Sequence, residues 1–123
     1  MSIVEVHSRL ANVALLYSIA MALWGLWRYF RRQGVDSNYW GSLVIAEIVY
    51  VVQAGLGAYI LLSGAGRLAN TFMHVLYGVV AILVVPGVFM FTRGDDQRRS
   101  MLIYALAFLF MIGILLRSQG TGG

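Results

Sequence analysis

The chain has 123 residues, of which 60% are hydrophobic and only 11% are charged, and it contains no cysteine. A soluble domain carries roughly 25% charged residues, so this composition excludes a water-soluble globular protein and predicts a single-domain integral membrane protein. The lack of cysteine excludes disulfides, cysteine-bound iron–sulfur clusters and covalently attached c-type haem, and the net charge of +4, carried by arginines that flank apolar segments, gives no indication of a nucleic-acid partner.

Four apolar segments predict an all-α fold, an up-down-up-down four-helix bundle that spans residues 1–123. A membrane span needs roughly 20 apolar residues at 1.5 Å each, and short links force consecutive helices to run antiparallel. The expected helices cover residues 8–31, 39–62, 68–92 and 99–117. Pro86 lies inside the third, where we expect a tolerated kink and not a helix end, and residues 118–123 are expected to fray.

The arginines are divided unevenly between the two ends of this bundle. The first and third links with their flanks hold six of the nine, and the N-terminus, second link and C-terminus hold one each. By the positive-inside rule, both termini are predicted to lie outside, and the expected location is a bacterial or archaeal cell membrane. An aromatic belt is predicted at the cytoplasmic boundary from Trp24, Trp27, Tyr29, Tyr39 and Trp40.

The chain has only two histidines, His7 and His74, and we predict that they meet. Each stands near the start of a helix, and the first and third helices of such a bundle run in the same direction and face each other across the core. Both imidazoles are therefore expected at similar depth near the same membrane face. Small residues follow each at helical spacing: Ala11, Ala14, Ser18, Ala22 and Gly25 after His7, and Gly78 and Ala81 after His74.

This combination is what a non-covalent haem b requires. A porphyrin is a flat plate that needs small side chains where it lies, and two imidazoles can bind its iron from opposite sides. We expect His7 and His74 to be the axial ligands, lined by Ala11, Ala14, Gly78 and Ala81. Arg9 and Arg67 lie on the same side and are expected to pair with the haem propionates. Small residues also line helix contacts that hold no cofactor, so a structural pair of histidines is the alternative.

The stretch LVIAEIVYVVQAGLGAYILLSG, followed by NTFMHVLYGVVAIL, resembles half of a heme A synthase. That family is built from two four-helix halves, each with one histidine at the outer end of its first helix and one at the outer end of its third. Gln53, Leu56 and Gly57 match the family's second helix, and the separation of the two histidines is similar. The resemblance implies the four-helix fold and the bis-histidine haem, and a half-length chain could act as a dimer.

Glu47 lies inside the second predicted helix, where an isolated carboxylate is unfavourable unless it is protonated or paired. One interpretation is a proton relay or quinone site. The simpler one is a protonated group that bonds a neighbouring helix, or a side chain that reaches the interface near Arg28 or Arg32.

Several functions stay open at this point. The first is a membrane b-type cytochrome for electron transfer, as a small subunit of a respiratory or photosynthetic complex. The others are a cofactor-free accessory subunit, a half-length haem-modifying enzyme that acts as a dimer, and a protein that binds another tetrapyrrole. Whether the chain is an enzyme is therefore undecided. The expected partners are membrane lipid, other membrane subunits or a second copy of the chain, and quinone.

Overall fold

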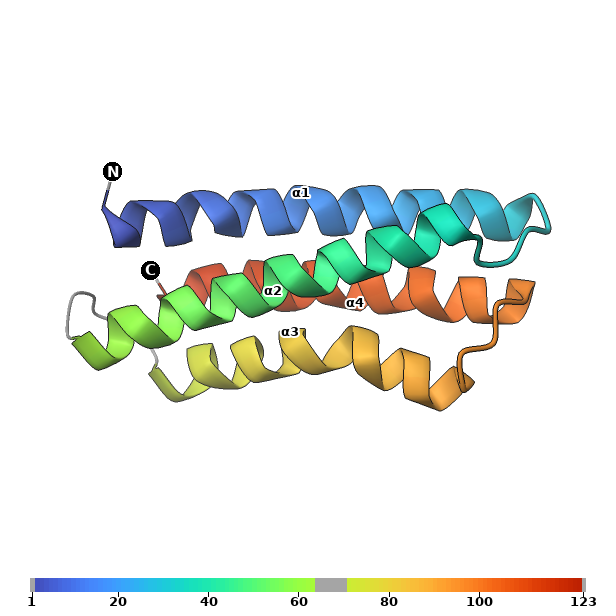
Figure 1. Ribbon diagram of the computed structural model, residues 1–123. Helices are drawn as coiled ribbons and strands as arrows, with labels where there is room; N and C mark the ends of the chain where they lie inside the picture. The colour runs from blue at the N-terminus through green and yellow to red at the C-terminus, as the bar shows by residue number, and fades with distance from the viewer. Residues whose placement is uncertain (1, 64–70, 123) are drawn as a thin grey trace.

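The computed structural model describes residues 2–63 and 71–122, and these form a bundle of long helices without a strand (Figure 1). The helices are α1 (Ile3–Phe30), α2 (Ser37–Ser63), α3 (Thr71–Thr92) and α4 (Arg98–Gly122). All four are long and apolar enough to cross a membrane. The predicted all-α membrane bundle is therefore confirmed.

Each helix packs against two others and lies diagonal to the third. α1 and α3 both contact α2 and α4, whereas α1 and α3 share no close backbone contact in the described ranges, and neither do α2 and α4. Both termini lie at one end of the bundle (Figure 1). We call this the terminal end, comprising residues 2–14, 53–63, 71–81 and 112–122. The arginine-rich end comprises the connections 31–36 and 93–97 and the helix residues beside them.

Three helices are longer than the sequence predicted, α2 by only a few residues and α1 and α4 by more. α1 begins at Ile3 and not at residue 8, because the Ser2 hydroxyl caps it by accepting a hydrogen bond from the Glu5 N–H. α4 continues to Gly122, so residues 118–122, which were expected to fray, are helical. α3 runs through Pro86 without a break, as predicted.

α1 and α4 make the most extensive contact in the bundle. α1 can approach α4 closely because its buried face is mainly small, and this face agrees with the predicted one. A Cβ atom built on Gly25 would lie 3.0 Å from the Ala105 Cβ and 3.1 Å from the Met101 Cε, so no larger side chain fits there. The buried residues of α1 are Ala14, Ser18, Met21, Ala22 and Gly25.

An aromatic cluster fills the core near the arginine-rich end. Tyr39 and Tyr104 are fully buried. Trp24 packs on Tyr39 with ring centroids 4.9 Å apart, and Trp40 packs on Tyr104 at 5.8 Å. Tyr39 belongs to the core and not to a belt, because its hydroxyl donates a hydrogen bond to a backbone carbonyl of α1. Of the predicted belt, Trp27 has the exposed position that was expected.

Polar contacts tie the two connections together at the arginine-rich end. The Val35 N–H donates to the Asp96 carbonyl at 2.7 Å, which joins the α1–α2 connection to the α3–α4 connection. Arg28 donates from Nε to the Gly34 carbonyl, and its guanidinium lies 3.2 Å from the Asp36 carboxylate. This end is therefore closed by hydrogen bonds and charge as well as by packing.

Two arginines adopt a left-handed backbone conformation just beyond helix ends. Arg32 has φ 60° after α1, and Arg93 has φ 54° after α3. This conformation costs an L-residue other than glycine about 1–2 kcal/mol, so both helices end on a residue that their backbone does not favour.

Large apolar side chains cover the outside of the bundle. Such an extended apolar surface is unfavourable in water and is suited to lipid. Among the most exposed side chains are Leu16, Leu62, Phe72, Met90 and Phe91.

The close approach at Gly25 gives a first prediction. Gly25→Val should lower the free energy of unfolding in detergent by about 1–3 kcal/mol, because the new methyl groups force α1 away from α4. Gly41→Val is the matched control, since a Cβ at Gly41 meets nothing within 4 Å. Thermal unfolding followed by circular dichroism measures both variants, and equal midpoints would contradict the importance of this contact.

Candidate functional site

The two histidines meet between α1 and α3 at the terminal end, where the sequence predicted them. Their ring centroids lie 6.4 Å apart and their planes are inclined by 71°. Both rings are in the described part of the chain, and no hydrogen bond joins one to the other. Because α1 and α3 do not touch, the imidazoles span the space between two diagonal helices.

His74 is held by α4. Its Nδ1 lies 3.0 Å from the carbonyl oxygen of Ser118. A carbonyl can only accept a hydrogen bond, so Nδ1 carries the proton. In a neutral imidazole the lone pair is then on Nε2, the nitrogen that can bind a metal. Metal-binding histidines usually have their second nitrogen held in this way.

Sequence reasoning missed Ser118 as a site residue. It lies in the segment that was expected to fray, and its carbonyl oxygen and its hydroxyl oxygen lie 3.0 Å and 3.4 Å from the His74 Nδ1. The stronger contact uses a backbone carbonyl, which every residue has, so the sequence pattern gave little indication of it. Ser118 reaches His74 because α4 continues as a helix beyond its predicted end.

His7 is held through its backbone and by the shape of α2. Gln53 donates from Nε2 to the His7 carbonyl at 2.8 Å. A Cβ on Gly57 would lie 3.1 Å from the His7 Cε1, so the ring lies directly against α2 where there is no side chain. Gln53 and Gly57 were noted in the sequence for the family resemblance, and the structure makes both neighbours of His7.

Polar atoms near His7 lack partners. The Nδ1 of His7 is buried, and no residue in the described ranges bonds to it. The Oε1 of Gln53 is in the same situation. Buried polar atoms are nearly always hydrogen-bonded, so two such atoms on adjacent residues of one site indicate a place where another group could bind.

Small residues surround the histidines toward the middle of the bundle. Ala14 and Ala81 are buried, and Ala11 and Gly78 are partly buried. A Cβ on Gly78 would meet nothing within 4 Å, so α3 leaves open space there. These four predicted residues therefore lie in the turns that follow the two histidines.

The small face predicted along the rest of α1 is present and buried, but neighbouring helices fill the space beside it. Ser18 donates to the Ala14 carbonyl, and the Tyr50 hydroxyl donates to the Ser18 oxygen. Tyr50 thus fills the groove from α2, and α4 fills it at Gly25. Small residues create a groove only where no neighbouring side chain enters, and along this part of α1 neighbouring side chains do enter.

Of the two arginines predicted to pair with haem propionates, the structure describes only Arg9. Arg9 lies at the terminal end with an exposed side chain, and its guanidinium is 2.8 Å from the Glu5 carboxylate. An exposed ion pair of this kind is weak, so Arg9 can exchange Glu5 for another anion. Arg67 lies outside the described residues.

Glu47 is partly buried in the middle of α2. Its Oε1 is buried and bonds to no residue in the described ranges. Arg28 pairs with Asp36, and no ion pair joins it to Glu47 among the described residues, so the role of Glu47 stays a prediction. The Tyr50 hydroxyl, one turn further along α2, bonds to Ser18.

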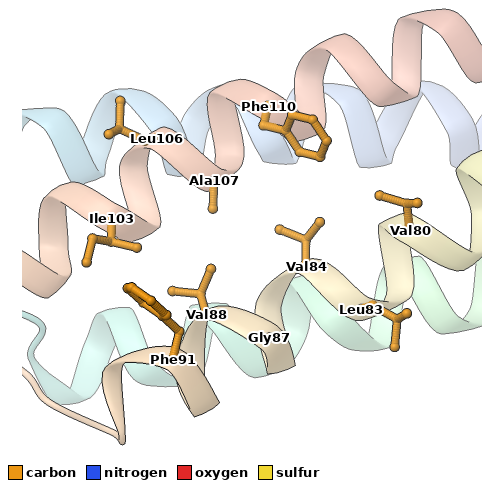
Figure 2. Close-up of a pocket in the computed structure, with 10 residues that line it drawn as sticks. All are labelled: Val80, Leu83, Val84, Gly87, Val88, Phe91, Ile103, Leu106, Ala107 and Phe110. Atoms are coloured by element: carbon orange, nitrogen blue, oxygen red, sulfur yellow. The ribbon is translucent and has the colours of Figure 1, made fainter.

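A groove of about 500 Å³ lies between α3 and α4, apart from the histidines (Figure 2). Its lining is apolar and offers no side-chain hydrogen-bonding group, so it cannot orient a polar ligand. Such a surface suits a lipid acyl chain. Val84, Gly87, Val88, Ala107 and Phe110 are among the lining residues.

Comparison with protein-family models, curated proteins and solved structures finds no match to this chain. The function is therefore inferred from the geometry of the histidine pair.

The hydrogen bond from Gln53 gives a second prediction. Gln53→Leu removes the donor to the His7 carbonyl and should lower the free energy of unfolding by about 1 kcal/mol, with faster amide hydrogen exchange in the first turns of α1. Gln33→Leu is the control, since Gln33 is exposed in the connection after α1. Unchanged exchange near His7 in Gln53→Leu would show that the bond does not hold α1.

Proposed function

We propose that the chain is a membrane b-type cytochrome that binds one haem between His7 and His74 and transfers electrons. The separation of the two rings carries this proposal. An iron between two imidazoles places the ring centroids about 6 Å apart, from two metal–nitrogen bonds of about 2 Å and the radius of each ring. The observed 6.4 Å agrees with that value.

The number of ligands favours haem over a bare metal ion. No group of three or more histidine, cysteine, aspartate or glutamate side chains gathers in the described part of the chain. Two imidazoles are too few for an ordinary protein metal site, which has three or four protein ligands. They are sufficient for haem, because the porphyrin supplies four nitrogens and the protein only the axial pair.

The protonation of His74 is a further support. The Ser118 carbonyl holds the proton on Nδ1, so Nε2 keeps its lone pair. His7 approaches from the diagonal helix, which puts the second imidazole on the other side of the space between α1 and α3. The resemblance to half of a heme A synthase suggests the same ligand pair.

Electron transfer is the reaction that fits this ligation best. Haem, when bound, would supply one-electron redox chemistry, and His7 and His74 would both be occupied in holding it, which would leave no place on the iron for a substrate. The residues of this chain would bind the haem, orient it through the two imidazoles, and exclude water with the apolar turns that follow them. Arg9 would neutralise a propionate at the end of the bundle.

The proposed partners follow from the same arrangement. The histidines lie close to one end of the bundle, so an electron donor or acceptor would approach there. α3 has only Ala81 and Val85 buried among the described residues, and its wide apolar surface could face lipid, another membrane subunit or a second copy of the chain. Quinone is a candidate redox partner, with Glu47 as the proton-handling group inside the bundle.

The third prediction tests the haem itself. The purified protein, expressed with ample haem, should show the sharp low-spin bands of a b-type haem in a reduced-minus-oxidised spectrum. His7→Ala and His74→Ala should each abolish this low-spin signature, because six-coordinate iron needs both imidazoles. A well-folded but colourless protein would refute the proposal and favour a cofactor-free accessory subunit.

The fourth prediction uses two glycines of α2. Gly57→Val should displace the His7 ring and lower haem affinity about 10-fold or more, as disturbed support of a metal ligand does. Gly55→Val is the matched control, because a Cβ at Gly55 meets nothing within 4 Å. Haem titration of the apoprotein in detergent measures both, and equal affinities would remove Gly57 from the site.

A further inference from the structure

We infer that the two axial ligands are unequal: His74 is the firm ligand, His7 is the exchangeable one, and a small neutral iron ligand such as carbon monoxide enters on the His7 side. This inference rests on the proposed haem site and adds a ligand-binding property to it. It follows from the different surroundings of the two imidazoles.

His74 has the support that strengthens a metal ligand. Its Nδ1–H donates to the Ser118 carbonyl, which comes from α4. This bond fixes the tautomer, limits rotation of the ring and raises the basicity of Nε2. The helix that supplies the carbonyl also packs along both α1 and α3, so the acceptor is held in place by the main contacts of the bundle.

His7 lacks that support. To bind iron through Nε2, His7 must carry its proton on Nδ1, which is buried and has no acceptor in the described ranges. The other tautomer puts the proton on Nε2 and prevents ligation. Either form is therefore less favourable than the corresponding form of His74. A supporting partner is worth about 10- to 100-fold in metal affinity, which sets the expected difference between the ligands.

The ring of His7 is held less directly than its backbone. Gln53 holds the backbone carbonyl of His7 and not its ring. The ring packs closely on Gly57, which has no side chain that could hold it by a hydrogen bond, and its Nδ1 has no partner in the described ranges. A turn of the imidazole therefore costs packing on α2 but breaks no hydrogen bond of Nδ1, and α1 stays docked on α2.

The surroundings select the kind of ligand that can replace His7. Ala11, Ala14 and Gly57 carry no charge, and Arg9, two residues along α1, has an exposed side chain that pairs with Glu5. An anion in the place of His7 would be buried while the Arg9 guanidinium stays exposed, which is unfavourable. A neutral diatomic molecule needs no partner. In the exchange the bond from iron to the His7 Nε2 breaks and a bond from ferrous iron to the carbon of carbon monoxide forms, without electron or proton transfer.

The experiment compares His7→Ala with His74→Ala in the full chain, each titrated with haem in detergent. His7→Ala should keep haem as a five-coordinate complex, bind carbon monoxide at once after reduction, and regain the low-spin spectrum when imidazole is added. His74→Ala should lose haem affinity at least 10-fold more than His7→Ala. Size-exclusion chromatography verifies that each variant is folded.

A second measurement keeps both histidines, so it does not depend on the folding of His74→Ala. Carbon monoxide should form an adduct with the reduced unmutated protein. Gln53→Leu should accelerate adduct formation, because the segment that carries His7 is less firmly held, whereas Gln33→Leu should leave the rate unchanged.

The outcomes separate this inference from the proposed function. The cytochrome proposal stands if the unmutated protein binds low-spin haem. The inference is overturned if, in addition, the two histidine variants lose haem affinity equally or His7→Ala loses more. Equal carbon monoxide rates in Gln53→Leu and the unmutated protein would also count against it. An unmutated protein that binds no haem would overturn both.

Discussion

The packing of α1 on α4 is the constraint on which the rest of the bundle depends. The small face of α1 lets α4 approach until Gly25 and Ala105 leave no room for another methyl group. With these two helices fixed and the connections short, α3 must lie diagonal to α1. His7 and His74 then face each other across a space that no backbone fills, and α4 is close enough to α3 for Ser118 to reach His74.

The two ends of the bundle are closed in different ways. The arginine-rich end is joined by the bond between Val35 and Asp96 and packed with buried aromatic rings such as Tyr39 and Tyr104. The hydroxyl of Tyr104 has no partner in the described ranges, but aromatic rings surround it, whereas the unpaired atoms of His7 and Gln53 at the terminal end belong to residues that contact each other. Two adjacent unsatisfied polar groups on a packed scaffold are what the proposed binding site would need.

The sequence was sufficient to predict the fold and the histidine pair, because both follow from the length, order and direction of the apolar helices. Apolar length gave the four helices, and chain order with helix polarity placed His7 opposite His74. Sequence reasoning failed where the surroundings of a residue depend on a side chain or carbonyl from another helix. Tyr50 enters the groove beside Ser18, and Tyr39 finds a carbonyl of α1 and becomes core. Ser118 reaches His74 with its backbone carbonyl at 3.0 Å and with its hydroxyl at 3.4 Å, and only the helical continuation of α4 brings it there.

Arg32 and Arg93 adopt positive φ values, which glycine adopts with less strain than any other residue. Glycine there would relax the folded chain, but it would also remove two of the positive charges that bias the orientation of a membrane protein by the positive-inside rule. A variant that carries glycine at both positions would therefore separate two properties of these residues: the conformational energy of the folded helix ends and the charge beside the membrane.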